Sequence, residues 1–220
     1  MKILAVEFSS GHRSVAVAES GDDGAVAVLG TAVEILASKT QALTLVGAAL
    51  AQAGVDREQI ECIAVGLGPG SYTGIRASIS LAQGWQLARG LRLLGISSVE
   101  CLAAQAQVTG WRGPVTLIID AQRSESYLAR YDLGPKLPCL MENLHLVSAE
   151  EVKRRLEAGE LVVGPEASRR FTHARDLFPE AAMLARLAGS RTDYVSGEKL
   201  EPIYLRETTF VKAPPPRSLP

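Results

Sequence analysis

The chain has 220 residues, 47% of them hydrophobic and 21% charged, with a formal net charge of -1. These values are ordinary for a globular protein of one large domain or two lobes, and they exclude an intrinsically disordered chain. Lysine and arginine form no cluster longer than the "KRR" at 153–155, which argues against tight nucleic-acid binding by the chain alone. The three cysteines are scattered, so neither a disulfide framework nor a zinc site is predicted.

The first predicted element is a hairpin of two strands over "KILAVEFSSGHRSVAVAES", whose first strand ends at the acidic Glu7. The apolar run before Glu7 is too short for a signal peptide. No window of the sequence reaches the roughly 18 apolar residues that a membrane span requires. We therefore expect a cytoplasmic protein with no membrane partner.

Helices and strands alternate after this hairpin. The pattern predicts a helix over Thr40–Ala53, the strand "IECIAVG", a long helix over Tyr72–Arg89, the strand "LRLLGI" and a helix over 98–107. Such alternation predicts an α/β fold with mixed sheets.

The second half of the chain repeats this pattern. A second hairpin, "VTLIIDAQRSESYLARYDL", places Asp120 where the first hairpin has Glu7. It is followed by "LHLV", a helix that begins at a capping box of Ser148 and Glu151, the strand "ELVVG" and further helix through Leu187. The duplication predicts two similar lobes.

We place the boundary between the lobes at the "GWRGP" stretch. The prediction is an N-terminal lobe over 1–109 and a C-terminal lobe over 110–209. Residues 210–220 contain three consecutive prolines and no apolar period, so we expect an extended tail there.

The stretch "GLGPGSYTGIRASISLAQG", residues 66–84, joins a predicted strand to the long helix, where free N–H groups can bind anions. It matches neither the Walker motif, nor the dinucleotide motif, nor the nucleophile elbow. Ser71 is the predicted N-cap. Gly74, Ser78 and Ala82 recur every four residues, and we interpret this small-residue face as a packing surface for another helix. A ligand-binding loop is the alternative.

Two acidic residues end equivalent strands. A carboxylate on each side of a cleft suits Mg²⁺, which binds carboxylate and phosphate oxygens. This makes Glu7 and Asp120, with the hydroxyls of Ser9 and Ser10, candidate residues for a nucleotide and magnesium. The alternative is that the acids only bond their own turns. The three histidines are single and far apart, so no histidine metal site and no nucleophile–histidine motif is predicted.

The string "GLGPGSYTGIR", followed by "SLAQGWQLA", resembles the bacterial TsaB (YeaZ) family, which takes part in making threonylcarbamoyladenosine in tRNA. "ILAVEFSS", "IIDAQRSESY" and "EPIYLRE" resemble further motifs of that family along the whole chain. The sequence departs from the family pattern at Glu7, Phe8, Lys39 and Gln122, where the family has Asp, Thr, His and Arg.

The resemblance implies an actin-like (ASKHA, sugar-kinase and Hsp70-like) duplicated two-lobe fold with mixed sheets and flanking helices. It implies no catalytic residues and no cofactor for the chain alone, and it leaves open ATP with Mg²⁺ at the interface of a complex. The implied partners are a TsaD-like transferase, which carries the metal-binding histidines, and a TsaE-like ATPase. The chain alone is expected to be a homodimer, with tRNA contacted only through the complex.

In the family, the first two helices of the N-terminal lobe form both the homodimer and the heterodimer interface. The expected partner-binding residues are Leu43, Val46, Leu50, Tyr72, Thr73, Gly74, Arg76, Ala77, Ser78, Ser80, Leu81 and Gly84. The hypothesis is therefore a non-catalytic scaffold that activates a TsaD-like transferase. The alternative is an enzyme acting on its own, either an actin-like ATPase that uses Glu7 and Asp120 or a glycoprotease-like hydrolase.

Overall fold

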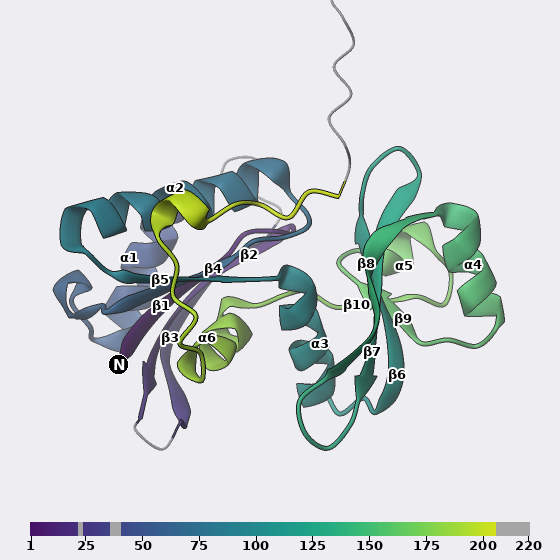
Figure 1. The fold of residues 1–220 in the computed structure, drawn as a ribbon, viewed down its shortest axis with the longest axis horizontal. Coiled ribbons are helices and arrows are strands. Elements are labelled where there is room, and N and C mark those ends of the chain that lie inside the picture. The colour runs from purple at the N-terminus through teal and green to yellow at the C-terminus, as the bar shows by residue number, and fades with distance from the viewer. Residues whose placement is uncertain (22–23, 36–40, 206–220) are drawn as a thin grey trace, which may run out of the picture.

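The computed structural model describes residues 1–21, 24–35 and 41–205, which form two lobes side by side (Figure 1). Each lobe contains one five-stranded sheet. The predicted residues Lys39 and Thr40 and the tail 210–220 lie outside the described residues. None of the helices in the described ranges is long and apolar enough to cross a membrane.

The first sheet has the strand order β3-β2-β1-β4-β5. Strands β1, β2 and β3 are antiparallel neighbours, whereas β4 and β5 run parallel to β1. The strands are β1 (Lys2–Glu7), β2 (His12–Ser20), β3 (Val26–Ile35), β4 (Cys62–Gly66) and β5 (Arg92–Ile96). The helices of this half are α1 (Ala42–Ala53), η1 (Arg57–Gln59), α2 (Tyr72–Arg89) and α3 (Ser98–Val108).

The second sheet repeats this topology, with the order β8-β7-β6-β9-β10 read in the same direction. Its strands are β6 (Gly113–Asp120), β7 (Glu125–Leu133), β8 (Cys139–Ser148), β9 (Val162–Gly164) and β10 (Arg175–Asp176). Its helices are α4 (Ala149–Glu157), α5 (Ala167–Arg170), α6 (Ala181–Gly189) and η2 (Gly197–Lys199). The predicted fold class, a duplicated actin-like α/β fold with mixed sheets, is confirmed.

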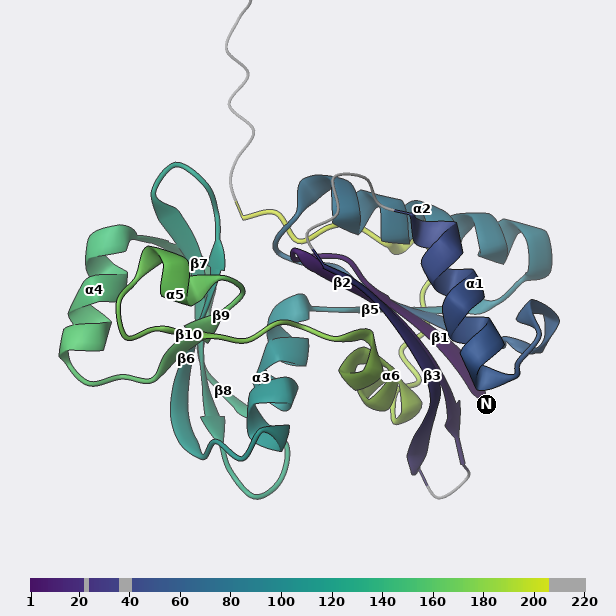
Figure 2. The same cartoon turned by 180° about the vertical axis from the view of Figure 1, so that it is seen from behind.

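Helices cover both faces of the first sheet (Figure 2). On the outer face, Leu45 of α1 and Ile75 of α2 pack into one core with Leu4 and Val6 of β1. On the inner face, α6 packs against the same strands. The second sheet is covered by α3 on its inner face and by α4 and α5 on its outer face.

The last helix of each half crosses toward the other half. The predicted C-terminal lobe, 110–209, includes α6, but the buried residues of α6 contact β1, β2 and β3 of the first sheet. Helix α3, predicted in the N-terminal lobe, places Leu102 and Ala106 in the core of the second sheet. The boundary at 110 therefore separates the two repeats in the sequence but does not separate the two packed cores. Helix α3 belongs to the first repeat and packs on the second sheet, whereas α6 belongs to the second repeat and packs on the first sheet.

Two strands were missed by the sequence reading. Strand β3, "VAVLGTAVEI", is a half-exposed edge strand with Gly30 in its middle, and the predicted elements do not include it. Strand β10 has only two residues. The sequence signal for β3 is its content of β-branched residues, since four of its ten residues are Val or Ile and one is Thr.

Candidate functional site

Helices α1 and α2 lie next to each other on the outer face of the first sheet (Figure 2). Ser71 caps α2 as predicted, since its hydroxyl accepts the N–H of Gly74. On the side away from the sheet, α2 exposes Thr73, Ser80 and Gly84, and α1 exposes Leu43 with 72% of its surface accessible. These residues are small or apolar, so a second helix can approach the backbone of α2 closely.

Exposure divides the predicted partner-binding residues into three groups. Exposed positions are Leu43, Tyr72, Thr73, Arg76, Ser80 and Gly84. Half-buried positions are Leu50, Ala77 and Leu81. Fully buried positions are Val46, Gly74 and Ser78. The first two groups are accessible to a partner, whereas the last group is not.

Val46, Gly74 and Ser78 are a correction to the prediction, and Val46 packs in the core of the first lobe. A Cβ atom on Gly74 would lie only 2.0 Å from the carbonyl oxygen of Phe8. Ser78 is fully buried and its hydroxyl donates to the carbonyl of Ile75. The buried small-residue face of α2 therefore packs on this chain's own first sheet, and the face open to a partner is the adjoining one with Ala77, Ser80 and Gly84.

The glycine-rich turn before α2 also packs on the end of β1. The N–H of Ser71 donates to the carbonyl of Ser9 at 2.7 Å, and a Cβ on Gly70 would lie 2.1 Å from the same oxygen. On its other side, Gly68 bonds to Ser98 at the start of α3. These close contacts account for the glycines of the turn, and no bound phosphate is needed to explain them.

Glu7 is fully buried beneath this turn. Its Oε1 accepts the N–H of Ser9 at 2.7 Å, and its Oε2 accepts the hydroxyl of Ser98 at 2.8 Å. A Cβ on Gly66 would lie 2.0 Å from Oε2. Burial raises the pKa of Glu7, and the hydrogen bonds from Ser9 and Ser98 only partly offset this rise. The Glu7 carboxylate at the end of β1 therefore contacts Ser98 at the start of α3 and lies against Gly66 at the end of β4.

Asp120 lies at the surface of a cavity of about 610 Å³ between the lobes, together with Ser9 and Ser10. Its Oδ1 is 2.8 Å from Nη1 of Arg170, and the carboxylate also accepts the N–H and the side-chain amide of Gln122. Asp120 is thus already paired within its own lobe.

Arg13 lines the same cavity, and its guanidinium is 3.9 Å from the carboxylate of Glu34. The Nε and Nη1 atoms of Arg13 are buried and have no hydrogen-bond partner among the described residues.

The two carboxylates predicted for magnesium do not form one site, although Ser9, Ser10 and Asp120 line the same cavity. Glu7 does not line the cavity, and both of its oxygens are occupied by Ser9 and Ser98, whereas Asp120 is bound to Arg170. Within the described ranges, no three His, Cys, Asp or Glu side chains are grouped so that they could hold a metal ion. The arrangement of Glu7 and Asp120 does not fit a shared Mg²⁺ with phosphate ligands.

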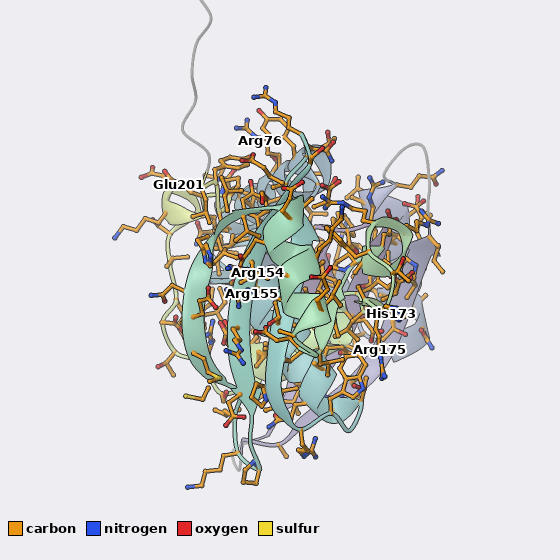
Figure 3. The ribbon with its side chains drawn as sticks, turned by 90° about the vertical axis from the view of Figure 1, so that its right-hand side faces the viewer. Arg76, Arg154, Arg155, His173, Arg175 and Glu201 are labelled. Atoms are coloured by element: carbon orange, nitrogen blue, oxygen red, sulfur yellow. The ribbon has the colours of Figure 1, made fainter. Side chains whose placement is uncertain are left out.

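Tyr204 was missed by sequence reasoning. Arg76 stacks on Tyr72, with its guanidinium carbon 4.3 Å from the ring centroid, and its Nε donates to the hydroxyl of Tyr204 at 3.2 Å. Figure 3 shows Arg76 at the top of the molecule, where Glu201 of the C-terminal segment also lies. Because Arg76 and Tyr204 are 128 residues apart, no local pattern links them. The sequence signal that contains Tyr204 is the "PIYLR" string, which resembles a family motif.

The duplicated topology and the cavity between the lobes define a two-lobe protein of the actin-like fold. A family model described as "TsaD: tRNA N6-adenosine threonylcarbamoyltransferase" matches residues 34–159, more than half of the chain. The chain belongs to this family, and within it to the TsaB (YeaZ) proteins.

Three relatives show this likeness. The tRNA threonylcarbamoyladenosine biosynthesis protein TsaB of Haemophilus influenzae is 26% identical over 239 positions, covering 97% of this chain and 98% of that protein. The Escherichia coli protein of the same name is 36% identical over 89 positions, covering 40% of this chain and 38% of that protein. The structure of YeaZ from Pseudomonas aeruginosa superposes with a TM-score of 0.76 at 27% identity, covering 93% of this chain and 99% of that one.

Proposed function

We propose that this chain is a non-catalytic subunit in tRNA threonylcarbamoyladenosine biosynthesis that binds and activates a TsaD-like transferase. In this proposal the partner transfers the threonylcarbamoyl group to adenosine, and this chain stabilises the competent arrangement of the partner. A TsaE-like ATPase joins the pair, and tRNA is contacted only through the complex.

The observation that carries the proposal is the outer face of α1 and α2. Thr73, Ser80 and Gly84 of α2 are exposed, and no atom outside the helix lies within 4 Å of a Cβ built on Gly84. Glycine in an exposed helix interior costs about 1 kcal/mol relative to alanine. A second helix that packs here would explain the glycine, because a residue without a side chain lets the two helix backbones approach each other closely.

Exposed apolar side chains frame the same face. Leu43 at the start of α1 is 72% exposed and Leu87 near the end of α2 is 89% exposed. Their burial on a partner supplies hydrophobic free energy of about 25 cal/mol per Å² of apolar surface. The name of the Haemophilus influenzae relative, which refers to tRNA threonylcarbamoyladenosine biosynthesis, supports the choice of pathway.

The proposal assigns one face to two competing assemblies. A homodimer of this chain and the heterodimer with the TsaD-like protein both use α1 and α2, so forming one excludes the other. Because Glu7 and Asp120 do not converge, we assign no catalytic role to this chain.

Size-exclusion chromatography with light scattering tests the proposal, on the chain alone and on a mixture with the TsaD-like protein of the same genome. We expect a homodimer alone and a one-to-one heterodimer in the mixture, formed at the expense of the homodimer. Two proteins that elute independently at micromolar concentration would contradict the proposal.

A further inference from the structure

The C-terminal segment after α6 runs back along the first lobe and is fixed beside α2. The N–H of Val195 donates to the carbonyl of Leu93 at 2.9 Å, and the N–H of Ile203 donates to the carbonyl of Leu67 at 2.9 Å. Between them, the carbonyl and N–H of Gly197 bond to the side chains of Gln83 and Gln86 on α2. This places Tyr204 next to the first turns of α2.

Tyr204, Tyr72 and Arg76 form a stacked group on the surface. The two tyrosine rings are 5.9 Å apart, and the guanidinium of Arg76 lies 4.3 Å from the Tyr72 centroid and 6.0 Å from the Tyr204 centroid. All three side chains are exposed, with Tyr72 at 57% and Tyr204 at 43%. The three side chains therefore contact one another in the chain alone, without a partner.

The guanidinium keeps most of its bonding capacity. The hydrogen bond to Tyr204 uses only Nε, so the N–H groups of Nη1 and Nη2 are left for another acceptor. No carboxylate among the described residues forms an ion pair with Arg76. Stacking on the ring faces leaves the edge of the guanidinium open, and that edge matches a carboxylate in a bidentate geometry.

We propose that Tyr204 holds Arg76 as a preformed anchor for a carboxylate of the TsaD-like partner. This inference rests on the proposed function and adds the C-terminal segment to the partner surface. Arg76 adjoins the small-residue face of α2, so a carboxylate on a partner helix that lies on that face can reach the guanidinium. Tyrosine and arginine are the residue types that most often dominate interfaces, and a side chain ordered in advance loses less entropy on binding.

Tyr204 is a positioning residue in this inference, because it acts through Arg76. Isothermal titration calorimetry with the TsaD-like partner measures the roles of both. We expect Arg76→Ala to weaken binding by about 10-fold to 100-fold, and Tyr204→Phe, which removes only the hydroxyl, by about 3-fold to 10-fold. The double variant should bind no more weakly than Arg76→Ala alone, since Tyr204 acts through the missing guanidinium.

Arg175 supplies the matched control. It lies over the ring of Trp111 at 5.9 Å, in the second lobe, and Arg175→Ala removes a stacked arginine without touching α2. We expect this variant to bind like the wild type. The loss caused by Arg76→Ala should also shrink as salt is raised, because a partly exposed ion pair is screened.

Three outcomes would overturn the inference. Additive losses in the double variant would make Tyr204 a separate contact and not a positioning residue. If Arg76→Ala bound like the wild type while Ser80→Arg on the same helix abolished binding, the role of Arg76 as an anchor would be refuted. The proposed function would still stand. Unchanged protein affinity with weakened tRNA binding by the complex would assign Arg76 to RNA phosphate. A wild-type chain that forms no complex would refute the proposed function itself.

Discussion

The two halves of this chain share one topology but differ in the helix that follows their fourth strand. In the first half this helix is α2 with 18 residues, whereas in the second half it is α5 with 4 residues. The following strand shrinks in the same way, from five residues in β5 to two in β10. The shared strand order builds both sheets, and the long helix of one half supplies the extra surface proposed for a partner.

The helices that follow the third strands differ in chemistry. Helix α1 exposes Leu43, Ala48 and Ala51, whereas α4 exposes Lys153 and Arg154. An exposed charged face is adequately solvated by water, and an exposed apolar face gains free energy when another surface covers it. This difference supports the proposal that a partner covers the outer face of the first half and not that of the second half.

The strand ends differ in burial. Glu7 and Asp120 end the equivalent strands β1 and β6, but Glu7 is buried against Ser9 and Ser98, while the side chain of Asp120 is 43% exposed and paired with Arg170. Equivalent positions in a duplicated fold therefore carry carboxylates with separate local roles.

The largest expected effect concerns the packing of α2 on β1. Gly74→Leu forces a side chain into the carbonyl of Phe8, so we expect a loss of more than about 4 kcal/mol of unfolding free energy, or no folded protein at all. Gly84→Leu, on the exposed face of the same helix, should retain or raise stability because leucine is the better helix former. Urea denaturation monitored by circular dichroism compares the two. Equal stabilities would contradict the assignment of the two faces.

The second prediction separates the outer faces of the two halves. Ser80→Arg places a long charged side chain on the proposed partner face, and we expect affinity for the TsaD-like partner to fall by about 100-fold or more. Ala158→Arg, at the exposed end of α4, is the matched control and should leave affinity unchanged. Calorimetric titration of both variants, after thermal melts confirm that both are folded, measures the difference. A larger loss for Ala158→Arg would move the interface to the second half.

The third prediction concerns the buried carboxyl of Glu7. Its pKa is raised above the ordinary value of 4.5, so the folded state retains a proton that the unfolded chain releases. The stability of the wild type should therefore fall as pH rises from 4.5 through the folded pKa. Glu7→Gln cannot ionise and keeps an acceptor for the N–H of Ser9, so its stability relative to the wild type should increase over that window. The measurement is the melting temperature of both proteins between about pH 4 and about pH 8. If the two melting temperatures changed with pH by the same amount, this account would be contradicted.

The smallest effect is expected at Asp120. Asp120→Asn removes a partly exposed ion pair with Arg170, which contributes about 1 kcal/mol or less to stability. Partner affinity should not change, because Asp120 is paired with Arg170 of its own lobe, even though the cavity that it lines also reaches Tyr72 and Tyr204. A magnesium-dependent nucleotide affinity that this variant abolished would instead favour the ATPase alternative.

Much of the fold could be predicted because it depends on local patterns. The hairpins, the long helix and the caps at Ser71 and Ser148 follow from alternation, small polar residues and glycine placement. The burial of Gly74 and Ser78 could not be predicted, since two adjoining faces of α2 are both small and only the tertiary fold selects the one that meets the sheet. The crossing of α6 to the first sheet and the contact of Arg76 with Tyr204 depend on distant segments and leave no local signal.

Hydrogen–deuterium exchange of this chain, free and bound to the TsaD-like protein, tests the central claim most directly. We predict slower exchange on binding in α1, in α2 and in the segment before Tyr204, with no change in α4 or α5. Protection confined to the second half, or a complex that protects neither α1 nor α2, would contradict the account.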